Sequence, residues 1–239
     1  MLKMLDLFSG IGGFSLAASW TGEIETVAFC EIDKYCTQVL NKHWPEVPVY
    51  LDIKQLRGED IGAVDIISGG FPCQPFSCAG KQRGKTDNRY LWPEMFRIIR
   101  EVKPRWVIGE NSSGLVNMEL EQCFLDLESE GYEVQSFIIP ACGVEAPHRR
   151  DRVWIVAYLD NYGSHREERN APKQGSHQSK NRVFVRNDTW PLEPGVGRVV
   201  YGIPNRVERI KGLGNAIVPQ VAYPIFQGIV DIERSLVYA

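Results

Sequence analysis

The sequence has no apolar run that approaches the roughly 18 residues of a membrane-spanning helix, although 44% of its 239 residues are hydrophobic. Its first residues, MLKMLDLFSG, lack the pattern of a secretory signal peptide. The net charge of −3 excludes a generally cationic protein but is compatible with a local basic groove. We therefore expect a cytoplasmic protein with a well-packed core and no membrane segment.

Cysteine is scarce, and its spacing does not suit a metal site. The closest pairs are Cys30 with Cys36 and Cys73 with Cys78, and no C-x-x-C spacing occurs. No zinc-ligand pattern is therefore present, and we expect no metal. A chain of this length does not need disulfides for stability, so we interpret all six cysteines as reduced thiols.

The first 159 residues alternate between strand-like and helix-like segments, which predicts an α/β fold with a parallel sheet covered on both faces. Apolar runs indicate strands at residues 2–7, 25–29, 64–67, 106–108, 134–139 and 153–158. Amphipathic segments indicate helices at residues 14–20, 34–43, 91–102 and 119–130. Ligands of such sheets bind beyond the carboxyl ends of the strands.

The rest of the chain has a different character. Residues 160–187 are polar and carry few apolar side chains, which indicates a loop or a small recognition insert. Residues 145–212 hold 13 Lys and Arg against 8 Asp and Glu, so a basic strip lies on an otherwise acidic chain. An apolar periodic pattern over residues 214–236 predicts a closing helix, complicated by Pro219 and Pro224.

A glycine-rich segment, DLFSGIGGF, follows the first strand and opens the first helix. Glycines there allow a tight turn and a close approach to a ligand. Glu31 ends the second strand, where a carboxylate can accept ribose hydroxyls, and Asp52 is placed for an adenine amino group. G-x-G-x-x-G is absent, and Asp6 with the compact turn suits an amino-acid group better than a pyrophosphate. The pattern therefore favours S-adenosylmethionine over a dinucleotide, and over a turn without a ligand.

The segment GGFPCQPFS, residues 69–77, holds Cys73 between two prolines just after a strand. A thiol fixed in such a loop at the sheet edge is well placed as a nucleophile. The alternative role, a small buried hydrophobic residue, fits Cys30, Cys36 and Cys123 better. Cys78 competes with Cys73 but lacks the proline frame.

Three further charged residues lie at the ends of predicted strands. Glu110 ends the strand at residues 106–108, where burial would raise its pKa and make it a proton donor. Arg150 and Arg152 precede the last strand and would point the same way if the backbone were extended. Taken alone, Glu110 is better explained as an exposed residue at a strand end, and a basic surface turn explains the two arginines equally well.

In their order, these motifs resemble the DNA (cytosine-5) methyltransferase family, in particular its small bacterial and phage members. The matching segments are DLFSGIGGFSLA, EID, FPCQPFS, DNRYLWPE, ENSSGL, APHRRDRVWIVA and GLGNAIVPQ. They run from Asp6 to Gln220, so the resemblance covers nearly the whole chain. The FPCQPFS segment together with GNAIVP is highly specific.

The resemblance implies a class I S-adenosylmethionine-dependent methyltransferase fold, which is Rossmann-like, in three parts. A catalytic and cofactor-binding domain would span residues 1–159, a very short target recognition region residues 160–197, and a returning segment residues 198–239. Besides Asp6, the implied cofactor-binding residues are Phe8, Gly10, Gly12 and Gly13 in the turn, Glu31 at the ribose, Asp52 and Ile53 at the adenine, and Phe71, Pro72, Leu91, Asn215 and Ala216 lining the pocket.

The resemblance also implies the chemistry. Cys73 would add to carbon 6 of a cytosine, which makes carbon 5 nucleophilic toward the methyl group. Glu110 would neutralise charge on the ring nitrogen, and Arg150 and Arg152 would support the base and the loop. The cytosine must be flipped out of double-stranded DNA, on which the class usually acts as a monomer. The basic strip at residues 145–212 would contact phosphates.

Two alternatives stay open. A related branch of the family methylates transfer RNA, so the substrate could be RNA. The chain could also be a catalytically weak remnant that binds DNA or cofactor without turnover. The short region at residues 160–197 would read a short site, or little beyond the phosphate backbone. The target sequence, and a role in restriction–modification, phage anti-restriction or regulation, are open as well.

Overall fold

The computed structural model describes residues 1–72, 90–117, 119–160 and 206–237. The predicted nucleophile Cys73, its competitor Cys78 and nearly all of the predicted recognition region at residues 160–197 lie outside the described residues. The polar segment at residues 160–187 therefore stays a prediction, and so does the division of the chain into three parts.

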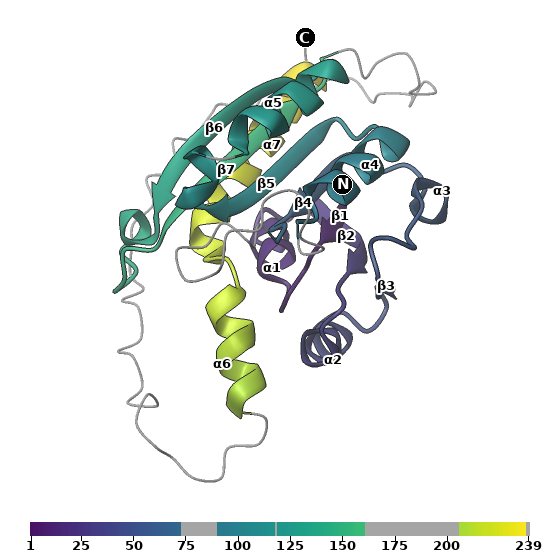
Figure 1. The fold of residues 1–239 in the computed structure, drawn as a ribbon. Coiled ribbons are helices and arrows are strands. Elements are labelled where there is room, and N and C mark those ends of the chain that lie inside the picture. The colour runs from purple at the N-terminus through teal and green to yellow at the C-terminus, as the bar shows by residue number, and fades with distance from the viewer. Residues whose placement is uncertain (73–89, 118, 161–205, 238–239) are drawn as a thin grey trace.

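The described residues form one seven-stranded sheet in the order β3-β2-β1-β4-β5-β7-β6 (Figure 1). Its strands are β1 Leu2–Leu7, β2 Ile24–Cys30, β3 Val49–Tyr50, β4 Ile66–Gly69, β5 Trp106–Ser112, β6 Glu133–Pro140 and β7 Asp151–Tyr158. The first five strands pair in parallel, whereas β7 runs antiparallel to both of its neighbours. This confirms a mostly parallel α/β sheet. The reversal follows from the short β6–β7 connection, because a parallel return needs a longer crossover.

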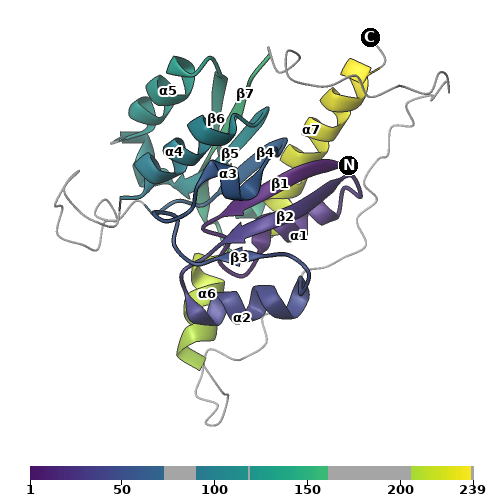
Figure 2. The ribbon, with the colours of Figure 1, turned by 90° about the vertical axis from the view of Figure 1, so that its right-hand side faces the viewer.

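Helices cover both faces of the sheet, as the alternating pattern predicts (Figure 2). They are α1 Gly13–Ser19, α2 Lys34–His43, α3 Gly58–Ile61, α4 Trp92–Val102, α5 Leu120–Ser129, α6 Arg206–Asn215 and α7 Pro219–Val237, with 3-10 turns at Ser113–Asn117 and Ala141–Val144. Helices α4 and α5 pack on one face, and α1 and α7 pack on the other. Helix α6 lies beside α2.

Each face has its own apolar core. On one side, Met95 and Ile98 of α4 are fully buried against Val107 of β5. On the other side, the ring of Phe14 meets the rings of Trp154 and Phe226 edge to face, with centroids 5.8 and 6.4 Å apart. Burial of each such side chain contributes roughly 1.5–3 kcal/mol. Because the two cores pack on both faces of the sheet, the ends of its strands are held in fixed positions.

The C-terminal segment differs from the prediction of one helix over residues 214–236. The structure has two helices, α6 and α7, separated by a short break after Asn215. Pro219 is the first residue of α7, where a missing N–H costs nothing, and Pro224 lies inside it. Helix α6 was not expected, because its Val207, Ile210 and Leu213 are exposed and form no buried apolar stripe.

The register of the parallel strands brings the predicted site residues together at one edge of the sheet, the one formed by the carboxyl ends of the parallel strands. Leu7 of β1 pairs with Cys30 of β2 and with Gly69 of β4, and Gly69 pairs with Gly109 of β5. The residues that follow Leu7, Cys30 and Gly69 therefore leave the sheet at the same level, and Glu110 of β5 follows Gly109 at this level while its strand continues to Ser112. The strand order reverses between β1 and β4, which is where ligands of open α/β sheets bind.

Candidate active site

The turn after β1 alternates between open and crowded positions. Phe8, Gly10 and Gly12 have positive φ angles of 52°, 54° and 86°. A Cβ on Gly12 would lie 2.6 Å from the ring of Trp44, so only glycine fits there. A Cβ on Gly10 would meet nothing within 4 Å. The ring of Trp44 therefore fills the space next to Gly12, whereas the space next to Gly10 is open.

Glu31 links this turn to the end of β2. Its Oε2 accepts a hydrogen bond from the Gly10 amide at 2.7 Å, and its Oε1 accepts one from the Asp33 amide at 2.7 Å. A carboxylate has about four lone-pair sites, so both oxygens can still accept hydroxyl groups. The neighbouring Ile32 is an apolar residue with 72% of its surface exposed. Sequence reasoning missed Ile32, although an apolar residue between two acids at a strand end was the available signal.

Asp52 and Ile53 follow β3 but play different parts. Asp52 is partly buried, and its Oδ1 accepts a hydrogen bond from the Lys54 amide at 3.0 Å. The side chain of Ile53 is only 4% exposed and belongs to the core. If Ile53 contacts a ligand, it does so through its backbone. Leu51, which precedes them, is 60% exposed on the same loop.

Asp6 lies underneath the glycine turn. Its side chain is fully buried and accepts hydrogen bonds from the hydroxyls of Ser15 at 2.8 Å and Ser68 at 3.1 Å. Burial raises the pKa of Asp6 to about 7, against the effect of the two hydroxyls. Its backbone carbonyl accepts a 2.6 Å hydrogen bond from the Ser9 hydroxyl. The enclosed carboxylate has no surface to offer a ligand, so we infer that Asp6 supports the turn from below.

The chain is firmly held just before the predicted nucleophile. Phe71 is 2% exposed, and its carbonyl accepts a 2.8 Å hydrogen bond from the Asn111 amide group. The Pro72 carbonyl accepts a hydrogen bond from the Leu91 amide at 3.3 Å. Pro72 itself is exposed, and Leu91 is half-buried. These contacts hold Phe71 and Pro72, the last described residues before the predicted nucleophile.

Glu110 is a buried acid within β5 and is not an exposed strand end. The strand continues to Ser112, and Glu110 is 8% exposed. Arg152 Nε lies 3.0 Å from Glu110 Oε1. Burial raises the pKa of Glu110 to about 7, although Arg152 and Arg150 both oppose the shift. Glu110 can therefore hold or release a proton near neutral pH.

Arg150 makes its hydrogen bonds to a different part of the chain from Arg152. Its backbone is left-handed, with φ 41°, so the extended backbone that would make Arg150 and Arg152 point the same way is not present at Arg150. Its Nη2 donates hydrogen bonds to the carbonyls of Gly214 at 2.9 Å and Ala216 at 2.7 Å. Both arginines nevertheless line one narrow pocket with Glu110 and Trp154. Arg150 thus connects the acid site to the end of α6.

The segment around the end of α6 lies over the glycine turn. Lys211 Nζ is 2.6 Å from Asp33 Oδ2, next to Glu31. A Cβ on Gly13 would lie 2.7 Å from the Ile217 side chain, which shows how closely that residue covers the turn. Asn215 is exposed and Ala216 is partly buried between these two contacts. The predicted residues at both ends of the chain are therefore brought together.

Other predicted features concern metals, thiols and membranes. Within the described residues, no three His, Cys, Asp or Glu side chains are grouped as a metal site would need. Burial raises the pKa values of Cys30 and Cys36 to about 12, so these thiols are unreactive. Cys123 is fully buried, as expected. In the same part of the chain, no helix is both long and apolar enough for a membrane span.

Together, the strand order, the glycine turn and the acid after β2 define a class I S-adenosylmethionine-dependent methyltransferase fold. Residues 2–192 match the family of C-5 cytosine-specific DNA methylases. The chain belongs to this family.

Curated relatives agree with this assignment. The chain is 37% identical over 169 residues to the type II methyltransferase M1.ScrFI of Lactococcus lactis subsp. cremoris, which covers 67% of this chain and 43% of the relative. It is 35% identical over 165 residues to the type II methyltransferase M.HhaI of Haemophilus parahaemolyticus, covering 67% and 50%. The chain therefore spans about half the length of the curated relatives that it matches.

Solved structures share the fold. A DNMT2 mutant of Spodoptera frugiperda is 28% identical with a TM-score of 0.58, over 72% of this chain and 54% of that one. A structure described as a prophage-encoded DNA modification methyltransferase from E. coli is 26% identical with a TM-score of 0.57, over 66% and 47%.

Proposed function

We propose that this chain transfers a methyl group from S-adenosylmethionine to carbon 5 of a flipped-out cytosine in double-stranded DNA. The observation that carries the proposal is Glu110, a buried acid with a pKa of about 7 that is paired with Arg152 at the sheet edge. The same edge carries the Gly10–Glu31 hydrogen bond. Family membership supports the assignment of these two groups to acid and cofactor roles.

The residues at this edge fit S-adenosylmethionine. Gly10 leaves open space where a Cβ would otherwise project, and Glu31 has free lone pairs for the two ribose hydroxyls. The exposed side chains of Ile32 and Leu51 offer apolar contact to an adenine ring near Asp52. When bound, S-adenosylmethionine supplies the methyl group from its sulfonium sulfur.

Glu110 would donate its proton, or share it, at the ring nitrogen of the cytosine. Its pKa of about 7 keeps a substantial protonated fraction at neutral pH. Arg152 holds the carboxyl group in place by its 3.0 Å contact, and Arg150 adds positive charge nearby. These charges would also stabilise electron density that builds on the ring.

Cys73 would provide the covalent step. Its thiolate would add to carbon 6, and the displaced electron pair of the ring would make carbon 5 nucleophilic. Carbon 5 would then take the methyl group as the bond from the methyl carbon to the sulfonium sulfur breaks, and S-adenosylhomocysteine would be the leaving group. A base removes the carbon 5 proton, and the electron pair expels the Cys73 thiolate. The held carbonyls of Phe71 and Pro72 support a fixed starting point for this loop. A stacked base cannot reach such a thiol, so the cytosine must leave the duplex.

DNA contact would rely on the basic strip at residues 145–212, which includes Arg149 and the 160–197 region. The strip favours phosphate binding with strong salt dependence. The monomeric state and the reading of a short target stay predictions.

The test is methyl transfer from labelled S-adenosylmethionine to unmethylated duplex DNA, with transfer RNA as the competing substrate. The proposal predicts label in DNA with wild type and none with Cys73→Ala, since the thiol is the nucleophile. Label in transfer RNA alone would favour the RNA alternative. Binding of S-adenosylhomocysteine without any transfer would indicate a catalytically weak remnant.

A further inference from the structure

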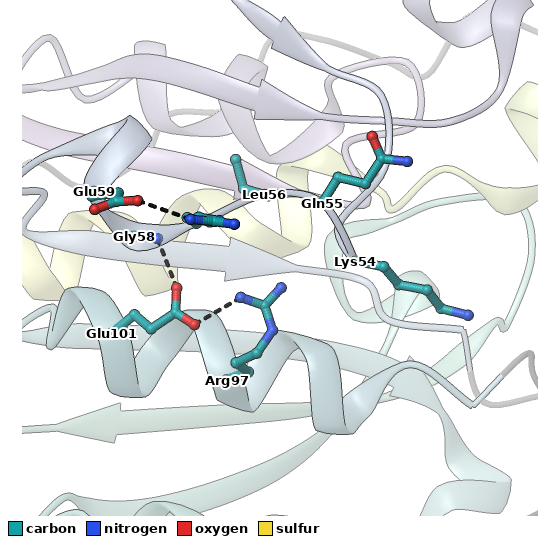
Figure 3. A pocket seen from close by; sticks show the side chains of 8 residues that line it. Lys54, Gln55, Leu56, Gly58, Glu59, Arg97 and Glu101 are labelled. Atoms are coloured by element: carbon teal, nitrogen blue, oxygen red, sulfur yellow. Dashed lines mark hydrogen bonds and ion pairs between the residues drawn. The ribbon is translucent and has the colours of Figure 1, made fainter.

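An open hollow of about 760 Å³ lies between helix α4 and the loop that follows β3. Figure 3 shows that the hollow is lined by residues 54–59 on one side and by Arg97 and Glu101 of α4 on the other. In Figure 3, Glu101 contacts both Arg97 on its own helix and the Gly58 amide on the opposite side. Hydrogen bonds from the Gly58 amide to Glu101 and from Arg97 to the Ile53 carbonyl therefore connect the two sides of the hollow.

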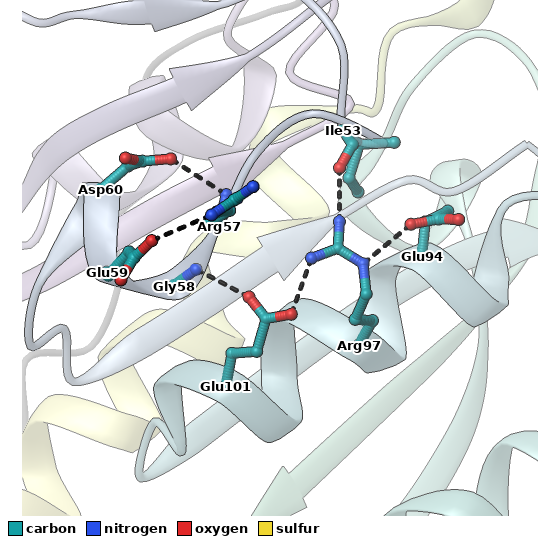
Figure 4. A network of polar contacts seen from close by, with 8 residues as sticks. All are labelled: Ile53, Arg57, Gly58, Glu59, Asp60, Glu94, Arg97 and Glu101. Atoms are coloured by element: carbon teal, nitrogen blue, oxygen red, sulfur yellow. Dashed lines mark hydrogen bonds and ion pairs between the residues drawn. The ribbon is translucent and has the colours of Figure 1, made fainter.

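Arg97 is the centre of this network (Figure 4). Its Nη2 donates a 2.6 Å hydrogen bond to the carbonyl of Ile53. Its Nε and Nη1 are held by the carboxylates of Glu94 at 2.9 Å and Glu101 at 2.8 Å. A guanidinium has a rigid, planar set of donors, so the two carboxylates fix the direction of the third hydrogen bond.

Glu101 fastens the other end of the same loop. Its second oxygen accepts a 2.7 Å hydrogen bond from the Gly58 amide, at the start of α3. A Cβ on Gly58 would lie 2.7 Å from the Cβ of Glu101, so the loop and α4 are in direct contact there. Burial opposes the shift, but Arg97 and the Gly58 amide hold the pKa of Glu101 below its usual value. Glu101 and Arg97 therefore stay charged at neutral pH.

The clamped loop is the one that carries the predicted adenine contacts. Asp52 immediately precedes the clamped carbonyl, and its Oδ1 already accepts a hydrogen bond from Lys54 inside the loop. The backbone carbonyl of Asp52 accepts further hydrogen bonds from Gln55 and Leu56 at 3.0 and 3.1 Å. The loop is thus a compact turn that is attached to α4 at two points, the Ile53 carbonyl and the Gly58 amide.

We propose that Arg97 is a positioning residue for adenine recognition: with Glu94 and Glu101 it holds the 52–58 loop so that Asp52 faces the adenine of S-adenosylmethionine. This inference rests on the proposed function, because it needs the cofactor to bind at this edge. Arg97 does not touch the reacting atoms. It acts through the carbonyl of Ile53, on a loop that sequence reasoning treated only as a ligand contact.

Calorimetric titration of the full chain with S-adenosylhomocysteine tests the inference. In Arg97→Lys, one ammonium group replaces the three-directional fork, and affinity should fall roughly 10-fold or more, as loss of a charged hydrogen bond implies. The preference for S-adenosylhomocysteine over S-inosylhomocysteine, which lacks the adenine amino group, should shrink as well. At saturating S-adenosylmethionine, kcat should stay within about twofold of wild type, because the acid site is untouched.

Arg100→Lys is the matched control. Arg100 lies on the same helix and pairs with Glu130 at 3.0 Å, away from the loop. Its side chain is 60% exposed, so the change should move neither affinity nor preference by more than about twofold. Hydrogen exchange of the amides at residues 54–58 should become faster in Arg97→Lys and not in Arg100→Lys.

The outcomes separate the inference from the proposed function. Wild type that binds S-adenosylhomocysteine, with an Arg97→Lys variant of equal affinity and preference, would overturn the positioning role alone. A lower unfolding temperature with unchanged preference would also overturn it, because that result describes a purely structural residue. Wild type that binds no S-adenosylhomocysteine would overturn the proposed function and, with it, this inference.

Discussion

Arg152 and Glu110 form an ion pair that crosses the antiparallel β5–β7 ladder diagonally. Arg152 stands opposite Ser112, two residues beyond Glu110, yet its Nε reaches Glu110 Oε1 at 3.0 Å. The reversed direction of β7 makes this possible, because it brings the start of β7 beside the carboxyl end of β5. The antiparallel strand is thus the feature of the sheet that places a cation on the buried acid.

Removal of this cation should make Glu110 a weaker acid. In Arg152→Gln, we expect the pKa of Glu110 to rise above its value of about 7, because a nearby cation lowers a carboxyl pKa by roughly 1 to 3 pH units. NMR titration of chain labelled with 13C-glutamate, with Glu110→Gln to identify the signal, measures the shift. A pKa that falls or stays unchanged would show that Arg152 does not control the acid.

Asp6 should make the fold less stable as pH rises. Its pKa is about 7 in the fold against 3.8 for the ordinary group. Between these values the folded chain holds a proton that the unfolded chain has lost, so stability falls with rising pH, by up to about 1.4 kcal/mol per pH unit. Asp6→Asn cannot titrate, and its stability should depend less on pH across this window.

Urea unfolding at several pH values from 4 to 7 measures this difference. Asp33→Asn serves as the control, because the hydrogen bond from Lys211 lowers the pKa of Asp33 below its ordinary value of 3.8. The stability that Asp33 contributes is lost only as pH falls below that ordinary value, so Asp33→Asn should keep the wild-type slope between pH 4 and 7. Equal slopes for wild type and Asp6→Asn would contradict the buried, proton-holding state of Asp6.

We expect the loss of the Arg150 side chain to weaken cofactor binding, and the loss of the Arg149 side chain to leave it unchanged. Arg150→Ala removes both hydrogen bonds to the carbonyls of Gly214 and Ala216, so the segment over the glycine turn loosens. We expect the KM for S-adenosylmethionine to rise about 10-fold or more. Arg149→Ala, which breaks an exposed pair with Asp151, should change KM by less than about twofold. Equal effects of the two substitutions on KM would contradict the role of Arg150.

Gly10 and Gly22 offer a test of the open space in the turn. Both have positive φ, 54° and 72°, and a Cβ on either would meet nothing within 4 Å. Gly10→Ala and Gly22→Ala should therefore each destabilise the fold by about 1–2 kcal/mol. Only Gly10→Ala should also weaken binding of S-adenosylhomocysteine, because its methyl group enters the proposed cofactor space. Calorimetry that finds wild-type affinity in Gly10→Ala would place the cofactor elsewhere.

Much of the fold could be predicted because apolar runs and glycine turns mark the parallel strands clearly. The strand at residues 106–108 was predicted too short, since Glu110 and Asn111 are polar and their burial depends on pairing with β7. Helix α6 escaped prediction because its apolar side chains are exposed and its position depends on contacts such as Lys211 with Asp33. Both the end of β5 and helix α6 depend on contacts with residues that are distant in the sequence, and the local sequence does not reveal such contacts.

The site shows the same division. The motifs placed Glu31 directly after a strand, where the structure has it after β2, and Glu110 at a strand end, whereas it lies inside β5; their roles stay predictions. They did not reveal that Asp6 is enclosed, that Arg150 turns to the carbonyl of Ala216, or that Arg97 holds the 52–58 loop. Each of these depends on a side chain that meets a backbone or hydroxyl group far away in the sequence.

The central claim is methylation of carbon 5 of cytosine in duplex DNA. The most direct measurement is mass spectrometry of the nucleosides from duplex DNA incubated with the chain and S-adenosylmethionine bearing a trideuterated methyl group. The account predicts trideuterated 5-methylcytosine with wild type and none with Cys73→Ala. Label on an exocyclic amino group of cytosine or adenine, or 5-methylcytosine that persists in Cys73→Ala, would contradict it.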